Sequence, residues 1–404
     1  MPSENPGSEP PLGVVAPTAD APAPTGATAR ITNLDTVRGV ATLGILVMNA
    51  VSFALPEAAY FNLEAAGRQT LLDWVIGVAG EIFVDQKTMA LFSMLFGAGI
   101  ALFADRAAQK HPRPVALSLW RNALLLGIGI LHGLLWEGDV LRIYAVCAPF
   151  LILVRNRSPR ALATAGAALV VGTAAIAAIA QTQIPTDGDG LGTYWFVDGG
   201  PIGDTAGIFL LSDFFFRAAG MMLIGVAAYR VGIIQGTRPP SYYRRMALGG
   251  LAIGLPLAAI GVAVQLATGF SPRIALIGEA PNTLATIPLA FGYLGLITLW
   301  NQRATTWLHE RVRAVGRMAL TNYLIHSLAG ILLFRVILDR GDATRTGVAV
   351  FVLFTWVVQA AVSKPWLNRH RFGPAEWAWR RLTYMQLPPF RGHQDWRARR
   401  QAHR

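Results

Sequence analysis

The run AGAALVVGTAAIAAIA, from Ala165 to Ala180, holds sixteen consecutive residues without a single charge. With its neighbours it forms an apolar stretch over 160–181, and an α-helix needs about 20 such residues to cross the hydrocarbon core of a bilayer. Its many alanines and glycines are typical of helices that pack closely against other helices in a membrane. We therefore expect a tightly packed transmembrane helix here, which sets the fold class.

Apolar stretches of similar length recur through the chain of 404 residues, which is 53% hydrophobic and only 14% charged. This composition excludes an ordinary soluble domain. The stretches that could span a bilayer are 37–55, 88–104, 120–136, 140–154, 160–181, 208–231, 245–268, 283–300, 317–337 and 347–363. We expect one all-α, polytopic integral membrane domain over residues 30–387, with about ten transmembrane helices.

The segment LLDWVIGVAGEIFVDQ, from Leu71 to Gln86, is harder to place. It is apolar enough to insert into a membrane, yet it carries Asp73, Glu81 and Asp85. A further complete span here would move the N-terminus to the other side of the membrane. We expect instead an interfacial or partly re-entrant helix on the outer side.

The connections between the apolar stretches alternate in charge. DRAAQKHPRP, RNRSPR, RPPSYYRR and HERVRAVGR are basic, whereas WEGD, TDGDGLGTYWFVDGGPIGD and GEAPN are acidic or neutral. The positive-inside rule places the basic connections in the cytoplasm. Both termini are then expected in the cytoplasm, and the WEGD turn outside.

The two ends of the chain differ in composition from its middle. Residues 1–29 are rich in Pro, Ala, Ser and Thr and lack the basic and apolar regions of a signal peptide, so we expect a disordered tail. From Lys364 onward there are ten Lys or Arg residues and two acidic residues, within a net charge of +12. Positive-inside topology explains this excess. We expect a basic cytoplasmic tail over 388–404 that can touch anionic lipid, and no nucleic-acid partner.

Ionisable residues within a membrane are costly, so they usually face the bundle interior or a water-filled cavity. In the first span, Asp35 and Arg38 are three residues apart and can pair on one helix face. Asn49 follows Arg38 by eleven residues, about three turns, and returns to that face. All three are candidate substrate-binding residues. The alternative is a structural role, with Asn49 in an interhelical hydrogen bond.

The stretch GILHGLLWEGDVLRIYA, from Gly129 to Ala145, gathers His132, Asp139, Arg142 and Tyr144 at the expected outer turn. An imidazole titrates near neutral pH and can act as a general base or nucleophile, and a nearby carboxylate can fix its tautomer. We take His132 and Asp139 as the candidate catalytic pair, and Arg142 and Tyr144 as candidate substrate contacts. The alternative is a histidine that only packs or hydrogen-bonds.

The ninth span, GRMALTNYLIHSLAG, carries four polar side chains within six residues. Asn322 and His326 share one helix face, as do Tyr323 and Ser327. Such a density exceeds what packing needs, so all four are candidate binding residues, with interhelical hydrogen bonds as the alternative.

Lys87 stands just before the second apolar stretch and is expected at the outer membrane boundary. There it could bind an acidic or phosphate-bearing group, or simply reach the interface along its aliphatic stem. The single cysteine, Cys147, rules out an intramolecular disulfide and a thiolate cluster. We expect no metal site and no tightly bound cofactor.

Five pieces of the sequence resemble, in order, the signature segments of the YeiB-like family of bacterial integral membrane proteins, a domain of unknown function. They are LDTVRGVATLGILVMN, KTMALFSMLFGAG, ILHGLLWEGDVLRIYA, GRMALTNYLIHS and RFGPAEWAWRRLTYM. The match runs from about Arg30 to about Leu387, and the last piece is the most distinctive. The resemblance implies a multi-pass protein of the bacterial inner (cytoplasmic) membrane.

The family is also distantly similar to the lysosomal heparan-α-glucosaminide N-acetyltransferase and to bacterial membrane acyltransferases that modify envelope sugars. Those enzymes carry an acyl group from cytoplasmic acyl-CoA to an acceptor across the membrane and use a histidine near the non-cytoplasmic face. The resemblance implies a membrane acyltransferase with acyl-CoA as co-substrate and a sugar or another small molecule as acceptor. His132 would be its histidine.

In this hypothesis Asp139 orients His132, Arg38 contacts the charged part of the donor, and Asn49 donates to the developing oxyanion. Two other functions stay open. One is a transporter or flippase for a small molecule or a lipid-linked substrate, whose pathway the same polar groups would line. The other is a non-catalytic membrane protein.

Overall fold

The computed structural model describes residues 31–385, which fold almost entirely into helices. Nine helical segments in this range are long and apolar enough to cross a membrane, and one apolar helix, α5, is shorter. An all-α, multi-pass membrane fold is therefore confirmed for this part of the chain, and each of the ten sequence-predicted spans coincides with one of these helices. The tails expected at 1–29 and 388–404 lie outside the described residues.

The α-helices are α1 (Thr32–Ala54), α2 (Leu71–Phe83), α3 (Lys87–Lys110), α4 (Pro114–Gly133), α5 (Leu141–Val154), α6 (Pro159–Gln181), α7 (Asp204–Arg230), α8 (Pro240–Ala267), α9 (Ala280–Asn301), α10 (Trp307–Arg317), α11 (Ala319–Ile331), α12 (Arg345–Arg369) and α13 (Pro374–Tyr384). Short turns of helix lie between them, namely η2 (Glu57–Tyr60), η3 (Gly192–Tyr194), η4 (Pro272–Ile274) and η5 (Ile277–Glu279). A π-helical segment, η6 (Leu332–Ile337), continues α11.

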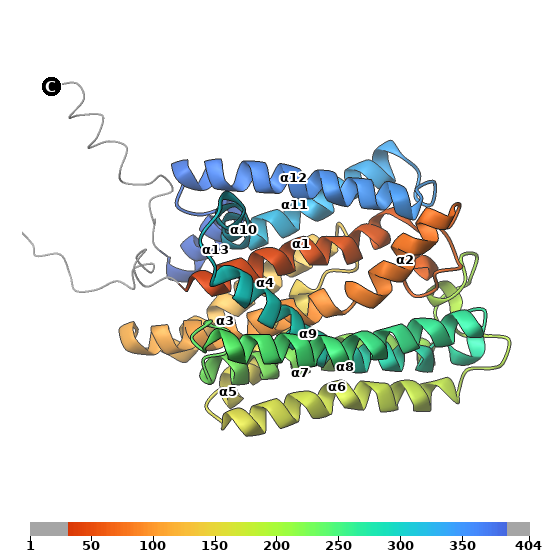
Figure 1. Cartoon of the computed structure of the whole chain (residues 1–404), viewed down its shortest axis with the longest axis horizontal. Helices are drawn as coiled ribbons and strands as arrows, with labels where there is room; N and C mark the ends of the chain where they lie inside the picture. The colour runs from red at the N-terminus through yellow and green to blue at the C-terminus, as the bar shows by residue number, and fades with distance from the viewer. Residues whose placement is uncertain (1–30, 386–404) are drawn as a thin grey trace, which may run out of the picture.

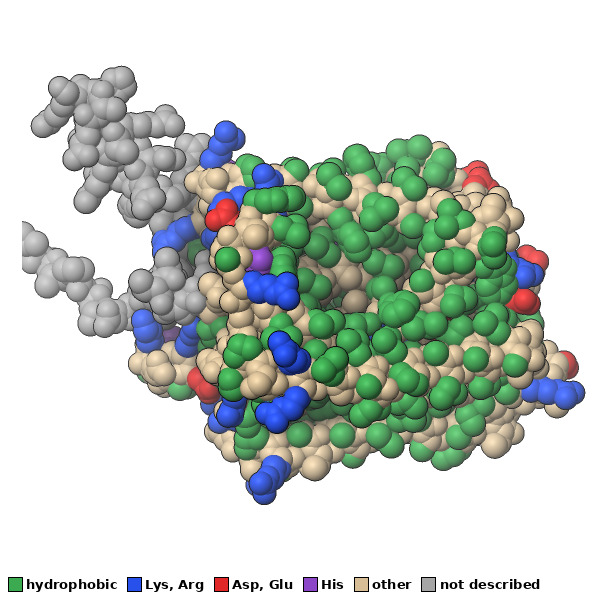
Figure 2. Space-filling model, viewed as in Figure 1, with side chains coloured by type: hydrophobic (Ala, Val, Ile, Leu, Met, Phe, Trp, Pro, Cys, Tyr) green, Lys and Arg blue, Asp and Glu red, His purple; other side chains and the backbone are tan. Residues whose placement is uncertain are grey.

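Most of the long helices run along one axis and form a bundle (Figure 1). We call the end that holds the arginine-rich connections α3–α4, α5–α6, α7–α8 and α9–α11 the basic end, and the other end the opposite end. The described chain starts and finishes at the basic end, with α1 and α13 (Figure 1). Figure 2 shows Lys and Arg side chains gathered there, while the long sides of the bundle are largely hydrophobic.

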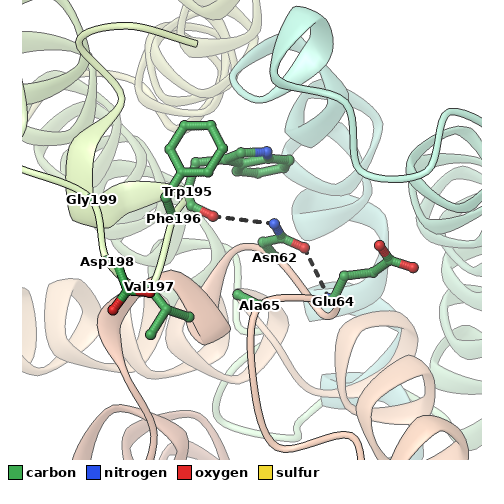
Figure 3. Close-up of a pocket in the computed structure, with 8 residues that line it drawn as sticks. All are labelled: Asn62, Glu64, Ala65, Trp195, Phe196, Val197, Asp198 and Gly199. Carbon is green, nitrogen blue, oxygen red and sulfur yellow. Dashed lines mark hydrogen bonds between the residues drawn. The ribbon is translucent and has the colours of Figure 1, made fainter. Parts of the chain in front are cut away.

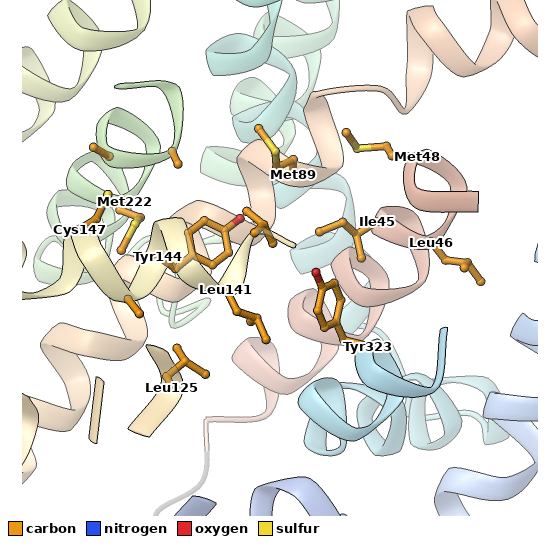
Figure 4. Packing of buried hydrophobic residues seen from close by; sticks show 14 of the residues in the cluster. Ile45, Leu46, Met48, Met89, Leu125, Leu141, Tyr144, Cys147, Met222 and Tyr323 are labelled. Carbon is orange, nitrogen blue, oxygen red and sulfur yellow. The ribbon is translucent and has the colours of Figure 1, made fainter. Parts of the chain in front are cut away.

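The outside of the bundle is apolar, as helices that face lipid require. Leu153, Phe354 and Val357 are each more than two-thirds exposed. Inside, the largest buried cluster joins side chains of α1, α3, α4, α5, α7, α11 and α12. Figure 4 shows Tyr144 and Tyr323 within this cluster.

Small residues let α3 and α7 approach closely. Gly97 of α3 lies against the carbonyl oxygen of Met222, and Gly225 of α7 lies against the carbonyl oxygen of Met94. A methyl group at either glycine would collide with backbone. Such direct contact between backbones stabilises helix pairs in lipid, where the hydrophobic effect does not hold helices together.

The segment Leu71–Gln86 does not lie apart from the bundle as an interfacial helix would. α2 packs against α8 and α12, and with α3 it forms one apolar segment over Leu71–Lys110. Gln86 interrupts this segment because its φ angle of 59° is left-handed, a conformation that breaks a helix. α2 is therefore the opposite-end part of the same crossing as α3. It adds no crossing, which leaves the expected order of crossings unchanged.

Candidate functional site

His132 and Asp139 meet at the turn between α4 and α5, as the sequence predicted. Nδ1 of His132 lies 2.8 Å from Oδ1 of Asp139, and the two residues are only 4% and 3% exposed. The turn lies against the far end of α1, where the Trp136 indole N–H donates to Oγ of Ser52 at 3.1 Å. Since α1 starts at the basic end, the pair belongs to the opposite-end part of the bundle.

Asp139 accepts three hydrogen bonds, and together they fix its position. Its Oδ1 accepts from His132 and from the Tyr323 hydroxyl at 3.0 Å, and its Oδ2 accepts from the backbone N–H of Arg142 at 3.2 Å. Because a carboxylate can only accept, Nδ1 of His132 carries a hydrogen, and the lone pair of the neutral imidazole is then on Nε2. This Nε2 atom is buried and has no hydrogen-bond partner among residues 31–385.

Aromatic rings surround the imidazole. The centroid of the His132 ring lies 5.2 Å from that of Tyr323 and 6.0 Å from that of Trp136. Gly129 and Gly133, which precede and follow His132 on α4, lie against the backbone and guanidinium of Arg142, so that the start of α5 packs closely on α4. The lone pair of Nε2 is therefore held in an apolar, enclosed environment.

Tyr323 reaches the site because α13 holds the start of α11. The Glu376 carboxylate accepts from the backbone N–H groups of Leu320 and Thr321, at 2.7 and 3.1 Å, and from the Thr321 hydroxyl. These amides are among those that a helix N-terminus leaves unpaired, so the carboxylate acts as a cap. The distinctive GPAEWAWRRLTY piece thus fixes α11 relative to α4 and α5.

Of the remaining residues of the turn, Arg142 stays at the site, where its Nε lies 3.9 Å from Oδ2 of Asp139, and Tyr144 does not. The guanidinium of Arg142 is 41% exposed and donates to the carbonyl oxygen of Glu137 at 2.6 Å. Tyr144 points away from His132, since its hydroxyl pairs with Oγ of Ser93 on α3 at 2.8 Å. Tyr144 was predicted as a substrate contact, but it packs within the α3–α5 interface.

The two faces of α11 separate as the spacing predicted. Asn322 and His326 face α12, where His326 pairs with Oε1 of Gln359 at 2.8 Å and Asn322 donates to Oγ of Ser363 at 3.4 Å. These bonds connect helices and are the structural alternative raised above. Tyr323 faces Asp139, and the buried hydroxyl of Ser327 has no partner among the described residues.

The polar residues of α1 lie at two depths. Nη1 of Arg38 lies 3.4 Å from Oδ1 of Asp35 at the basic end, which is the expected pair. Asn49 is buried near the opposite end of α1, three residues before Ser52, and its Nδ2 has no hydrogen-bond partner in the described chain. The expectation of an interhelical hydrogen bond from this amide nitrogen is therefore not met.

Further arginines accompany Arg38 at the basic end. The guanidinium carbon of Arg121 on α4 lies 4.3 Å from the ring centroid of Phe103 and 4.1 Å from that of Trp379. The charges of Arg38 and Arg380 both act on Arg121. Arg121 thus has two further cations within electrostatic range, and such a group favours anions.

Lys87 is not exposed at the surface of the bundle, as a lysine that reaches the membrane interface would be. Its side chain is fully buried, and Nζ donates to the carbonyl oxygen of Glu81 and to Oδ1 of Asn282. The break at Gln86 turns the start of α3 into the bundle, where the ammonium satisfies oxygens of α2 and α9. Lys87 therefore belongs to a different site from His132.

Sequence reasoning did not connect Lys87 with the charged residues around it. The charges of Asp85, Glu81, Glu279 and Arg217 act on Lys87. The same cluster includes Asp213, Tyr60 and Gln265, which contact or act on these carboxyl groups or line a cavity with them. Asp213 and Arg217 form an ion pair across one turn of α7. Their four-residue spacing inside the apolar run 208–231 was a signal that could have revealed them, because an ion pair in a span is rarely without a role.

A pocket of about 550 Å³ opens at the opposite end between the α1–α2 and α6–α7 connections (Figure 3). Nδ2 of Asn62 donates to the carbonyl oxygen of Trp195 at 3.2 Å, and Oδ1 of Asn62 accepts from the backbone N–H of Glu64 at 2.9 Å. Its lining is formed by Asn62, Glu64, Ala65, Trp195, Phe196, Val197, Asp198 and Gly199. None of these residues was a sequence candidate.

Comparison with known proteins identifies a family without an established activity. Residues 228–386 match the family described as "Protein of unknown function (DUF418)". The chain is 33% identical over 383 residues to the uncharacterized protein YeiB of Escherichia coli (strain K12), which covers 89% of this chain and 98% of that protein. It is 28% identical over 417 residues to the uncharacterized protein YxaH of Bacillus subtilis (strain 168), covering 91% of this chain and 97% of that protein. The chain therefore belongs to the YeiB-like, DUF418 family of proteins of unknown function.

Proposed function

We propose that this protein is a membrane-bound acyltransferase in which His132 is the general base and Asp139 orients it. The observation that carries the proposal is the buried pair itself, with Nδ1 bonded to Asp139 at 2.8 Å and Nε2 left without a partner. A buried imidazole whose tautomer is fixed by a carboxylate is the arrangement that activates hydroxyl and amine nucleophiles in acyl transfer.

The chemistry needs no metal. The acceptor hydroxyl or amine would give its proton to Nε2 of His132 as its oxygen or nitrogen attacks the carbonyl carbon of an acyl-CoA thioester. The carbon–sulfur bond then breaks, and the leaving thiolate takes the proton back from the imidazolium. The Nδ2 group of Asn49, unpartnered near the opposite end of α1, is the candidate donor to the oxyanion.

The basic end is where the donor would bind. Acyl-CoA carries several phosphate charges. Arg121, beside the aromatic rings of Phe103 and Trp379, would bind them together with Arg38 and Arg380, whose charges act on Arg121. Guanidinium groups bind phosphate well because their donors form a planar fork. By the positive-inside rule, this end and both termini would lie in the cytoplasm, with the protein in the inner membrane of a bacterium.

The test uses the full chain, purified and placed in lipid nanodiscs, with radiolabelled acetyl-CoA and an extract of envelope sugars. We expect release of free CoA and label on an acceptor. His132→Gln should lower this rate by at least about 100-fold, the usual contribution of a general base. Asp139→Asn should lower it as well, because the amide cannot hold the same tautomer.

Cys147→Ala is the matched control, since Cys147 lies buried on α5 and contacts neither His132 nor Asp139 through any hydrogen bond. It should keep the full rate. If no acceptor is labelled and acetyl-CoA also fails to raise the melting temperature of the protein, the acyltransferase proposal is wrong.

A further inference from the structure

A second buried site, built around Lys87, lies where α2 meets α3. Four carboxyl groups, those of Glu81, Asp85, Asp213 and Glu279, interact there with Lys87, Arg217 and one another. Arg345 of α12 adds a third cation through its interaction with Glu81. The acids still outnumber the cations by one, and an uncompensated charge in the interior of a membrane protein is costly.

Two of the four carboxylates are paired with a cation or with a hydroxyl group. Asp213 is paired directly with Arg217 on α7. Asp85 accepts from the Tyr60 hydroxyl at 3.0 Å, and burial, together with the charge of Asp85, raises the pKa of Tyr60 well above its usual value, which keeps this hydroxyl a donor. The Lys87 ammonium does not neutralise a carboxylate by direct contact, because its two hydrogen bonds go to uncharged oxygens.

Glu81 and Glu279 line one small cavity of about 20 Å³, and the charge of Glu279 acts on Glu81. Both residues are half-buried. One oxygen of Glu279 accepts from Nε2 of Gln86 at 3.1 Å. Two carboxylates beside one cavity of this size repel each other when both are ionised, and a shared proton removes that repulsion.

Gln265, on another helix, also supports a proton shared by Glu81 and Glu279. It lies on α8, is only 4% exposed, and lines the cavity together with Glu81 and Glu279. Neither its amide nitrogen nor its amide oxygen has a hydrogen-bond partner among residues 31–385. An amide can donate to an ionised carboxylate and accept from a protonated one, which suits it to a group that changes protonation state.

We infer that Glu81 and Glu279 share one exchangeable proton, and that the cluster around Lys87 is a proton-binding site. The proton would exchange with the opposite end across the segment Phe61–Leu63. Phe61 and Leu63 line the small cavity, whereas Asn62, between them, lines the large pocket of Figure 3. The site stands apart from His132, so the inference does not rest on the proposed acyl transfer.

Dicyclohexylcarbodiimide tests the inference, because it reacts with protonated carboxyl groups in apolar surroundings. A carbodiimide nitrogen takes the acid proton while the carboxyl oxygen bonds to the carbodiimide carbon, so the adduct keeps all atoms of both reactants. Peptide mapping by mass spectrometry of the full chain in nanodiscs locates the adduct. We expect it on Glu81 or Glu279, with labelling that falls as the pH is raised.

Three variants sharpen the result. Glu279→Gln should abolish the shared proton and lower labelling of Glu81 at least tenfold, or shift it to lower pH. Glu64→Gln, at the wall of the large pocket, should leave labelling unchanged, as should His132→Gln. Asp213, paired with Arg217, serves as an internal control that stays unlabelled.

Infrared spectroscopy is a second measurement, for the case in which dicyclohexylcarbodiimide does not reach the buried carboxyl groups. The infrared carbonyl band of a protonated carboxyl, shifted by deuterium exchange, should be present in the wild type and lost in Glu279→Gln. Labelling of Asp85 or Asp213 in place of the glutamates would overturn the inference. The absence of both the adduct and this band would do the same.

Discussion

Tyr323 of α11 donates to Oδ1 of Asp139 across 3.0 Å, and the same oxygen accepts from Nδ1 of His132. This bond joins residues 184 positions apart in the sequence. The orientation of the imidazole therefore depends on where α11 lies, and α11 in turn is capped by Glu376 of α13. The family's most distinctive sequence piece and its candidate catalytic residue belong to one connected structure.

Tyr323→Phe removes one of the three donors to Asp139 and keeps the ring. One hydrogen bond contributes about 1 kcal/mol, so we expect the rate of acyl transfer to fall about 5- to 10-fold while the KM for acetyl-CoA stays the same. Tyr144→Phe is the matched control, because its hydroxyl bonds Ser93 instead. Equal losses of activity in both variants would contradict a positioning role for Tyr323.

Glu376→Ala removes the cap from the start of α11. Loss of a capping side chain costs about 1 to 2 kcal/mol, which thermal unfolding in detergent should detect as a lower melting temperature. Glu376→Gln keeps an acceptor oxygen for the amides of Leu320 and Thr321 and should be much milder. A melting temperature for Glu376→Ala equal to that of the wild type would show that the cap is not needed.

The Glu376 carboxyl should also make the stability of the folded protein depend on pH, and the direction of this effect can be derived. Burial raises the pKa of the Glu376 carboxyl above its usual value, against the opposing effect of the hydrogen bonds from Thr321. The folded protein then binds this proton more tightly than the unfolded chain, a stabilisation that is complete below the unfolded pKa and lost as pH rises through the folded one. Melting temperatures of the wild type should fall relative to Glu376→Gln as pH rises above about 4.5.

Gly97→Ala should destabilise the α3–α7 contact, because its methyl group would meet the carbonyl oxygen of Met222. Overpacking of this kind costs about 1 to 3 kcal/mol. Gly99→Ala, two residues further along α3, is the control, since a methyl group there would meet nothing within 4 Å. Thermal unfolding should separate the two variants, and equal stability would mean that the backbones can move apart freely.

Arg121→Gln tests the donor site at the basic end. We expect a several-fold rise in the KM for acetyl-CoA with little change in kcat, and a weaker dependence of KM on salt, since exposed charge interactions are screened. Arg157→Gln changes an exposed arginine of another basic connection and should leave KM unaltered. An unchanged KM in Arg121→Gln would place the donor elsewhere.

Hydropathy was sufficient to predict the transmembrane spans, and helical spacing was sufficient to predict which polar residues share each face of α11. These patterns are local, so a single sequence contains them. The pairing of His132 with Asp139 was also within reach, because seven residues separate the two and a turn can close that distance.

The cluster around Lys87 was not predictable in the same way. The charges of Glu81 and Asp85 argued against insertion of α2. Several of the residues that interact with them, namely Arg217, Glu279 and Arg345, lie more than a hundred residues away in the sequence. A short stretch of sequence shows that burying each charge is unfavourable, but it does not show the distant cation that compensates this charge in the folded protein. For the same reason Lys87 was expected at the boundary, whereas the break at Gln86 turns it into the bundle.

The shortness of α5 has a consequence for the lipid around the protein. Its 14 residues rise about 21 Å, against a hydrocarbon thickness of about 30 Å. When a helix is shorter than the hydrocarbon core by this much, the bilayer around it becomes thinner locally or the flanking residues and neighbouring helices adjust. Headgroups of the leaflet at the opposite end would then sink toward the α4–α5 turn, which shortens the path from a membrane-borne acceptor to His132. The turnover of such a substrate should accordingly rise in bilayers built from shorter acyl chains.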